Sequence, residues 1–379
     1  MKQAAAFFLA LWLLTMPAYA ITPLTDNAIP IDAPAACLLE QSTGTVLYEK
    51  DAHSRRHIAS VTKVMTLLLV MEAIESGAIT WDTEVVASAN AASMGGSQIW
   101  LEQGERMTVK EMVKCITVVS ANDCSVAMAE QLSGSETAFA ARMNDRAAAL
   151  GLKNTHFTNC TGLFDDPDHY SSAYDVAVMA RELMTHDAIR EFTTIWTDTA
   201  RNGEFGLSNT NKLIRYYDGA TGLKTGFTNG AMYCLAATAQ RDGTAYVAVV
   251  LGADSSDHRF ESAKTLLSHG FASYSLCDVA QAVPLPRVRV TLGQSEYVIP
   301  VCGEGSRLLL EKEQAGLLRY VPTLPERVAA PVAEGQQLGT IGVYSGNTLL
   351  AEVPVVAQTS ADAMTVWQIA KMLLRFDWA

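Results

Sequence analysis

A serine and a lysine stand three residues apart in ASVTKVMTLLLVMEAIESG, residues 59–77. The apolar spacing predicts a helix from about 60 to 76, on which Ser60 and Lys63 share one face of the first turn. A serine hydroxyl is a weak nucleophile until a base takes its proton, and a lysine can be that base only when its amine is neutral. Burial, a second cation and the positive end of the helix would each lower the lysine pKa. The pair could start an acyl transfer, or Ser60 could simply cap the helix.

The tripeptide SAN at residues 120–122 is a second place where polar side chains could enter a cleft. It lies between segments whose apolar spacing predicts helices over 107–118 and 123–132. The same S-x-N pattern recurs at residues 88 and 345, in predicted surface turns. The position of residues 120–122 between two apolar helices is therefore what favours a functional site there.

The tripeptide KTG at residues 224–226 occurs once and begins a predicted strand. Alternation along a strand would place Lys224 and Gly226 on one face and Thr225 on the other. Lys224 could then be the second cation that lowers the pKa of Lys63, and Gly226 would leave room for a ligand backbone. The alternative is a strand that starts with a surface lysine.

The elements that must position these motifs alternate between strand and helix. Residues 35–50 predict two short strands, and from about 221 the apolar period changes from helical to alternating, with an Asp242-Gly243 hairpin turn. We expect an α+β domain over about 30–275, in which strands at both ends bracket a helical insert. Further helices are predicted by apolar spacing over 135–151, 172–186 and 256–274.

The C-terminal part predicts two different structures. After Pro284-Leu285-Pro286, short alternating runs with Pro and Gly turns predict a small all-β domain over about 284–358. Residues 361–379 predict an amphipathic helix, which is too short and too charged to span a membrane comfortably. It suits a membrane interface, with Trp367 and Trp378 near the headgroups, or it could dock on the β domain.

The N-terminus and the overall charge indicate where the protein acts. Residues 1–20, MKQAAAFFLALWLLTMPAYA, combine a cation, an apolar run and an A-x-A ending, which predicts a secretory signal peptide. The chain of 379 residues has 49% hydrophobic and 18% charged residues, which is typical of globular proteins. Its formal net charge of −12 argues against nucleic acid as a partner, since phosphate binding needs a basic face.

The cysteines and histidines do not predict a metal site. The 7 cysteines are widely spaced and include no C-x-x-C pair, so we expect mostly buried thiols and cannot assign a disulfide. His53 and His57 have the spacing of helical metal ligands, but they lie in HSRRH between two arginines and have no third ligand nearby.

The three motifs follow the order S-x-x-K, S-x-N, K-T-G, which is that of the penicillin-recognising serine enzymes. The chain closely resembles the low-molecular-weight D-alanyl-D-alanine carboxypeptidases over nearly its whole length. IASVTKVMT, VVSANDCSVAMAE, HYSSAYDVAVMARELM and GLKTGFTNGA carry the resemblance. It implies a DD-peptidase/β-lactamase-like domain, an antiparallel sheet with flanking helices and a helical insert, followed by a small all-β domain and an amphipathic anchor. The match at Thr161, in CTGL, is looser, and we leave it out of the catalytic set.

The resemblance implies a role for each candidate catalytic residue. Ser60 would attack the carbonyl between two D-alanines and form an acyl-enzyme, with Lys63 as its general base. Ser120 would relay the proton to the departing D-alanine. Asn122 would hold the substrate amide and Lys63, and Lys224 would polarise Ser120.

The resemblance also implies how substrate is bound. Thr225 and Arg259 would hold the terminal carboxylate beside Gly226, and the backbone N–H groups of Ser60 and Phe227 would form the oxyanion hole. The implied substrate is the peptidoglycan pentapeptide and the implied inhibitors are β-lactam antibiotics, with no cofactor and no metal. The enzyme would be extracytoplasmic and attached to the outer face of the cell membrane through its C-terminal helix.

Several alternative functions share this fold. A class A β-lactamase needs a glutamate in an E-x-x-L-N loop, which we do not find in the sequence. A transpeptidase or endopeptidase would use the same acyl-enzyme with a different acceptor, so the motifs do not separate it from a carboxypeptidase. A non-catalytic wall-binding protein is disfavoured because all three motifs are intact.

Overall fold

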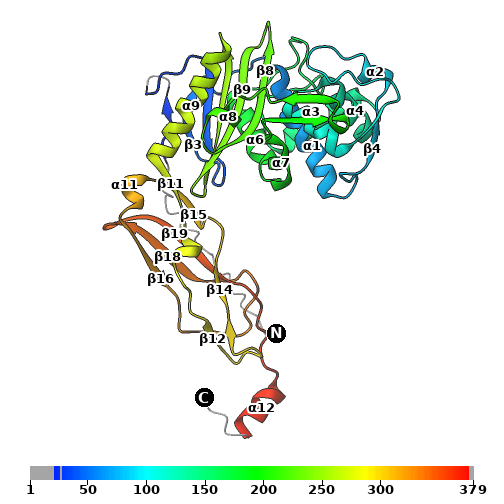
Figure 1. The fold of residues 1–379 in the computed structure, drawn as a ribbon. Helices are drawn as coiled ribbons and strands as arrows, with labels where there is room; N and C mark the ends of the chain where they lie inside the picture. Colours follow the sequence, from blue (N-terminus) through cyan, green and yellow to red (C-terminus); the bar gives the residue numbers. More distant parts are fainter. Residues whose placement is uncertain (1–20, 26–27, 375–379) are drawn as a thin grey trace, which may run out of the picture. The chain divides into compact units, whose positions relative to one another are not determined.

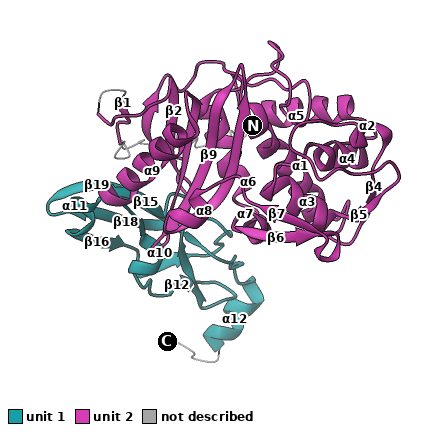
Figure 2. Cartoon of the chain, turned by 45° about the horizontal axis from the view of Figure 1, so that its top comes forward, with its two compact units in different colours: residues 1–20, 275–379 teal, residues 21–274 magenta. Residues whose placement is uncertain are grey.

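The computed structural model describes residues 21–25 and 28–374 (Figure 1). The predicted signal peptide, residues 1–20, and the last residues of the predicted terminal helix, 375–379, lie outside the described residues. The chain forms two compact units, a larger one of residues 21–274 and a smaller one that includes residues 275–374 (Figure 2).

The larger unit is built on a six-stranded sheet with helices on both faces (Figure 1). Neighbouring strands are antiparallel except β1 and β3, which are parallel. On one face, the Tyr246 hydroxyl donates to the Gly270 carbonyl of α9 at 3.1 Å. On the other, Val247 and Val249 share a buried apolar core with the helical insert. In sheet order the strands are β1 (Leu24–Thr25), β3 (Val46–Lys50), β2 (Ala35–Glu40), β10 (Thr244–Ala253), β9 (Met232–Arg241) and β8 (Ala220–Thr228).

The helical insert contains the helices expected from apolar spacing. The principal helices of this unit are α1 (Lys63–Glu75), α3 (Val109–Val118), α4 (Asn122–Ser133), α5 (Glu136–Ala149), α6 (Ala173–Leu183) and α9 (Ser256–Ser273). Short elements join them: α2 (Ala89–Ala92), α7 (Arg190–Thr193), α8 (Leu213–Tyr216), and the paired strands β4 (Glu84–Val86) with β5 (Arg106–Thr108) and β6 (Thr197–Ala200) with β7 (Phe205–Ser208). Those strands of three or four residues are too short to show a clear alternation in sequence.

The predicted helix start at Ser60 is wrong by one short turn. Residues Ala59–Thr62 form a 3-10 turn, η1, and α1 begins at Lys63. Ala59 has φ 47°, a left-handed conformation that apolar spacing does not predict. The Ser60 side chain caps neither η1 nor α1, so the capping alternative does not describe this serine.

The smaller unit is mainly β-structure. A four-stranded sheet has the order β14-β19-β18-β16 and a three-stranded sheet the order β13-β12-β17, while β11 pairs with β15. Ile341, Val343, Val353 and Val355 are fully or almost fully buried in its core. Its elements are β11 (Tyr274–Asp278), α10 (Val279–Ala282), β12 (Val288–Thr291), β13 (Tyr297–Val298), β14 (Pro300–Cys302), β15 (Arg307–Glu311), α11 (Lys312–Ala315), β16 (Leu318–Thr323), β17 (Arg327–Ala329), β18 (Gln337–Ser345) and β19 (Thr348–Ala357).

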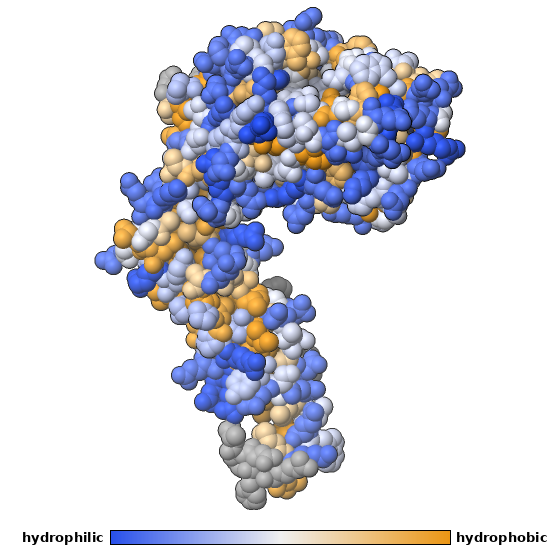
Figure 3. Space-filling view, in the orientation of Figure 1, coloured by the Kyte–Doolittle hydropathy of each residue, from blue (hydrophilic) through white to orange (hydrophobic). Residues whose placement is uncertain are grey.

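The described part of the terminal segment forms α12 (Val366–Leu374). Three of its apolar side chains are open to solvent: Val366, Trp367 and Leu374 are 82%, 81% and 80% exposed. Apolar and polar side chains both reach the surface around this helix (Figure 3). Within the described ranges, no helix is both long and apolar enough to cross a bilayer.

Candidate active site

Lys63 and Ser60 form a hydrogen-bonded pair at the junction of η1 and α1. The Nζ atom of Lys63 is 3.0 Å from Ser60 Oγ, 2.6 Å from Asn122 Oδ1 and 2.9 Å from the carbonyl oxygen of Thr161. Lys63 is fully buried, whereas Ser60 is half-buried. The serine can therefore meet a substrate while the lysine stays out of bulk water.

Burial lowers the pKa of Lys63 to about 7, although electrostatic interactions with Cys160, Asp123 and Glu136 oppose the shift. Desolvation disfavours the ammonium form, so the amine is half neutral near neutral pH. A neutral amine has a lone pair that can accept the Ser60 proton. This meets the requirement for a general base that the sequence motif alone could not establish.

The turn that presents Ser60 is fixed by close backbone packing. A Cβ atom added to Gly162 would lie 2.0 Å from the Ala59 carbonyl oxygen, and Gly162 also has φ +68°. Only a glycine lets the segment after Thr161 cross η1 so closely. The crossing brings the Thr161 carbonyl to Lys63 Nζ. Sequence reasoning missed this contact, because any residue carries a carbonyl and its type gives no signal.

The S-x-N turn supplies Asn122 to the same lysine. The Asn122 side chain accepts from Lys63 and donates to the Gly95 carbonyl at 2.7 Å, and its backbone N–H donates to Ser97 O at 2.7 Å. Ser120 has φ 66° and is 3% exposed. Its Oγ has no hydrogen-bond partner among the described residues, so this buried hydroxyl remains available to a bound substrate.

Lys224 lies on β8, is buried and interacts electrostatically with Lys63. Its Nζ donates to the Thr225 carbonyl at 2.9 Å. The pKa of Lys224 is lowered by burial first, and then by the positive charges of Lys63 and Arg259. Burial is the cause that lowers the pKa of Lys63. Repulsion between two ammonium groups disfavours the charged form of both, so burial and Lys224 act in the same direction on Lys63.

The missing side chain of Gly226 makes room for the backbone of the turn that carries Ser60. A Cβ atom at this position would lie 2.7 Å from the Ile58 carbonyl oxygen and 3.1 Å from the backbone nitrogen of Ser60. The space expected to admit a ligand backbone is thus filled by the turn that carries Ser60. The glycine allows β8 to pack directly against that turn, which places the Ser60 N–H beside the strand.

The expected carboxylate-binding residues lie around the same strand. Thr225 Oγ1 donates to Thr210 Oγ1 at 2.7 Å, and Arg259 Nη1 donates to the Gly226 carbonyl at 3.0 Å. Arg259 is 8% exposed, its Nε has no partner, and it forms no ion pair within the described part of the chain. Burial lowers the pKa of Arg259. A buried guanidinium without a carboxylate partner favours the binding of an anion.

Phe227 follows the motif at the edge of the site. Its side chain is 49% exposed and packs on Tyr233 with ring centroids 4.5 Å apart. The ring of Tyr233 also lies 5.3 Å from the Arg259 guanidinium. The structure thus brings Ser60, Lys63, Asn122, Gly226 and Arg259 into one connected set of contacts.

The residues tested for metal binding have other partners. His53 Nε2 lies 3.1 Å from Glu49 Oε1, and His57 Nδ1 lies 3.2 Å from the His169 carbonyl. Among the described residues, no group of three or more His, Cys, Asp or Glu side chains is placed to hold a metal ion. The 7 cysteines carry free thiols in this structure.

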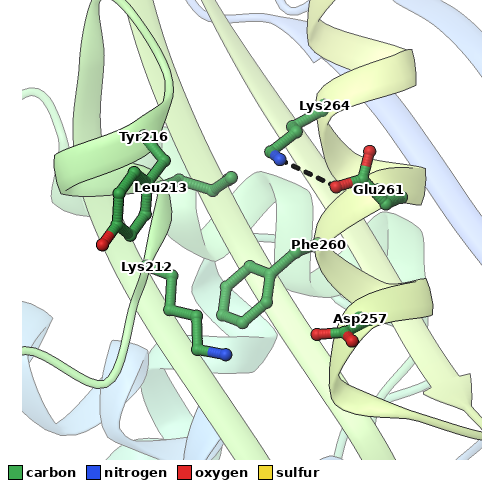
Figure 4. A pocket seen from close by; sticks show the side chains of 7 residues that line it. All are labelled: Lys212, Leu213, Tyr216, Asp257, Phe260, Glu261 and Lys264. Carbon is green, nitrogen blue, oxygen red and sulfur yellow. Dashed lines mark hydrogen bonds and ion pairs between the residues drawn. The ribbon is translucent and has the colours of Figure 1, made fainter.

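A separate cavity of about 110 Å³ lies between α8 and α9 (Figure 4). Lys212, Leu213 and Tyr216 line one side, and residues of α9, including Phe260 and the ion pair of Lys264 with Glu261 at 2.7 Å, line the other. None of the candidate site residues lines it.

Comparison with known proteins assigns the family. A model described as D-alanyl-D-alanine carboxypeptidase matches residues 22–255, more than half of the chain. The chain belongs to the D-alanyl-D-alanine carboxypeptidase family. A second model, described as the C-terminal domain of penicillin-binding protein 5, matches residues 281–362.

Individual members of the family cover most of the chain. D-alanyl-D-alanine carboxypeptidase DacF of Bacillus subtilis is 42% identical over 332 residues, which is 86% of this chain and 85% of DacF. The structure of penicillin binding protein 5 from Haemophilus influenzae superposes with a TM-score of 0.76 at 26% identity, covering 90% of this chain and 100% of that one. A mutant of the Streptomyces K15 DD-transpeptidase gives a TM-score of 0.60 at 29% identity over 64% of this chain and 99% of its own. The fold is therefore the mixed α/β DD-peptidase fold followed by the all-β domain of low-molecular-weight penicillin-binding proteins.

Proposed function

We propose that the protein is a serine-type D-Ala-D-Ala carboxypeptidase, which removes the terminal D-alanine from peptidoglycan stem peptides. The observation that carries this function is the half-buried Ser60 hydroxyl held 3.0 Å from the amine of a buried lysine whose pKa is lowered to about 7. Family membership supplies the substrate class.

The first half of the reaction makes an acyl-enzyme. Neutral Lys63 takes the Ser60 proton as Oγ attacks the carbonyl carbon between the two D-alanines. The backbone N–H groups of Ser60 and Phe227 stabilise the oxyanion. Ser120 gives its proton to the nitrogen of the departing D-alanine and takes the proton that Lys63 received from Ser60, the C–N bond breaks, and the peptide remains bound to Ser60 as an ester. The unpartnered Ser120 hydroxyl supports this role.

The second half returns the free enzyme. A water molecule attacks the ester carbonyl and gives one proton to Lys63, which passes it to Ser60 Oγ as the ester bond breaks. The shortened peptide leaves as its carboxylate after the acid loses the second proton to solvent. In both halves Asn122 holds the Lys63 amine and the substrate amide. Lys224 polarises Ser120, and Thr225 and Arg259 bind the terminal carboxylate.

β-Lactam antibiotics are expected to acylate the same serine. The β-lactam amide would open on Ser60 Oγ as the peptide bond does, but its leaving nitrogen stays tethered. The family includes proteins named as penicillin-binding. Covalent penicillin binding therefore follows from the same chemistry.

A transpeptidase is the second candidate, because the structure also matches the Streptomyces K15 DD-transpeptidase. The two activities differ only in whether water or an amine takes the acyl group. D-Alanine release from a defined pentapeptide, with and without an added amine acceptor, separates them. Free tetrapeptide as the main product in both reactions supports the carboxypeptidase, and an amine-linked product as the main species supports the transpeptidase.

We also propose the cellular location and the domain limits. Residues 1–20 would direct export, residues 30–275 would form the catalytic domain, residues 284–358 the β domain, and residues 361–379 a membrane-surface helix. The solvent-exposed Val366, Trp367 and Leu374 support the last assignment. Deleting residues 361–379 should release the protein from membranes, and retention after the deletion would reject this anchor.

A further inference from the structure

An open groove of about 550 Å³ adjoins the S-x-N turn but contains none of the candidate catalytic residues. It is lined by Trp100, Glu102, Gln103, Gly104, Glu105 and Arg201. Trp100 is 63% exposed, an uncommon position for so large an apolar side chain. The groove therefore offers one flat apolar surface among polar groups.

The backbone of Trp100 is held in a strained conformation. Its φ is 56°, in the left-handed region that bulky residues rarely adopt. The carboxylate of Asp123 accepts from Ile99 N at 3.0 Å and from Leu101 N at 3.1 Å, one bond on each side of the tryptophan. Arg201 donates to the Trp100 carbonyl at 3.1 Å. Strain of this kind persists where the surroundings enforce it, and it concentrates at binding sites.

The Trp100 ring is also held in place by a neighbouring aromatic ring. Phe205 contacts it edge to face, with centroids 5.7 Å apart. The same loop that carries Trp100 binds the catalytic turn, since Ser97 O accepts from Asn122 N at 2.7 Å. The exposed ring is thus preorganised and rigidly connected to the residue that holds Lys63.

The charges of the groove identify the chemistry that fits it. Arg201 forms two hydrogen bonds to the Glu105 carboxylate, at 2.8 Å and 3.0 Å, so this acid is already paired. Glu102 and Gln103 are exposed and line the same groove as Trp100, so the groove carries a carboxylate and an amide group. An aromatic face with carboxylate and amide groups at its rim suits a sugar, whose C–H face packs on the ring while its hydroxyls hydrogen-bond. Because Arg201 neutralises the Glu105 carboxylate, the groove attracts a cation less strongly.

We propose that this groove binds the glycan strand to which the stem peptide is attached, with Trp100 as the stacking platform. The proposal rests on the proposed function, because only a peptidoglycan enzyme meets such a polymer. It makes Trp100 a specificity-determining residue that distinguishes wall-linked peptide from free peptide.

The test compares two substrates that share one pentapeptide, free or attached to its disaccharide. Trp100→Ala should lower kcat/KM about tenfold on the disaccharide pentapeptide, mainly through KM, and change it less than about twofold on the free pentapeptide. Tyr216→Ala is the matched control, since Tyr216 is a 65% exposed aromatic residue at the other cavity, and it should affect neither substrate.

The other outcomes overturn the proposal. An equal loss of kcat/KM on both substrates would mean that Trp100 supports the catalytic turn. An unchanged kcat/KM on both would mean that the groove does not bind the disaccharide. Acetylating the side-chain amine of the free peptide should leave kcat/KM of the wild-type enzyme unchanged. If it lowers kcat/KM as much as Trp100→Ala does, the groove binds that amine and not a sugar. Failure of the carboxypeptidase assignment is separately visible, because wild-type enzyme would then release no D-alanine from the free pentapeptide.

A direct measurement guards against misfolding of Trp100→Ala. Isothermal titration with peptide-free glycan strands should show binding to the wild-type protein and to Tyr216→Ala, but about tenfold weaker binding to Trp100→Ala. Each variant must also acylate with penicillin at the wild-type rate. Equal affinity of the glycan strands for wild type and Trp100→Ala would place the sugar elsewhere.

Discussion

The amine of Lys63 lies 2.6 Å from Oδ1 of Asn122, and both side chains are buried. The amide oxygen accepts a hydrogen bond but carries no full charge. It therefore does not offset the effect of burial, which lowers the pKa of the lysine to about 7. An ionised carboxylate in the same place would hold the ammonium form. The choice of asparagine at residue 122 therefore determines whether the lysine can be a base at neutral pH.

The pH dependence of acylation follows from this pKa. Protonated Lys63 cannot accept the Ser60 proton, so the second-order rate constant for penicillin acylation should rise about tenfold per pH unit below about 7 and level off above it. Stopped-flow or timed labelling with a fluorescent penicillin between pH 5.5 and 9 measures this curve. A rate that is flat across pH 6 to 8 would mean that Lys63 is not the titrating base.

Asn122→Asp should move that curve to higher pH. An opposite charge within hydrogen-bond distance raises a lysine pKa by about one to three units. At pH 7 the acylation rate should then fall about fivefold to five-hundredfold, with partial recovery as the pH increases. Asn122→Ala is the comparison, because it removes the amide without adding a charge. An unchanged midpoint in Asn122→Asp would contradict the electrostatic role assigned here.

Gly226→Ala should damage the site through the backbone of Ser60. The added Cβ would meet the Ile58 carbonyl at 2.7 Å and the Ser60 nitrogen at 3.1 Å, so the turn must shift. We expect about 1–3 kcal/mol lower free energy of unfolding and a loss of acylation rate of about tenfold or more. Chemical denaturation and penicillin labelling measure the two effects.

Gly206→Ala is the control for that substitution. Gly206 lies on β7, and a Cβ there would have nothing within 4 Å. It should leave both stability and acylation close to wild type. Wild-type acylation by Gly226→Ala would show that the close approach of β8 to the Ser60 turn is not needed for catalysis.

His169 should make the larger unit sensitive to acid. Its Nε2 lies 2.7 Å from Thr62 Oγ1 behind η1, and burial lowers its pKa from 6.5 to about 4. Between pH 6.5 and about pH 4, His169 binds a proton in the unfolded chain but not in the folded chain. The free energy of unfolding therefore falls as the pH drops through this range. The shift corresponds to about 3 kcal/mol at most.

His169→Gln isolates this contribution, since glutamine does not titrate. Denaturation curves at pH 7 and pH 4.5 should show a smaller acid loss of stability in the variant than in wild type. Identical acid losses in the two proteins would mean that His169 is protonated, or already exposed, in the folded state.

Most of the architecture could be predicted from the sequence, because the spacing of apolar residues indicates which segments are helices and which are strands. The long helices α1, α3, α4, α5, α6 and α9 and the hairpin of β9 and β10 bury regular faces, so their spacing is visible in the chain. The missed hairpin strands β4 to β7 have only three or four residues each. Their pairing depends on contacts far apart in sequence.

The sequence indicated the types of the site residues better than their geometry. The positive φ of Ala59 and Ser120 is imposed by packing, and residue type gives no warning of it. The space above Gly226 is occupied by the Ser60 turn, which only the fold reveals. Likewise, the complete burial of Lys63, which lowers its pKa to about 7, is visible only in the fold.

The central claim is that Ser60 is the acylated nucleophile, and mass spectrometry of the penicillin-treated protein tests it most directly. Wild-type protein should gain the mass of one penicillin, and digestion should place the adduct on the peptide that contains Ser60. Ser60→Ala should gain no mass while keeping the wild-type denaturation curve. An adduct on the Ser60→Ala protein, or an adduct of the wild type on the peptide that contains Ser120, would contradict the account.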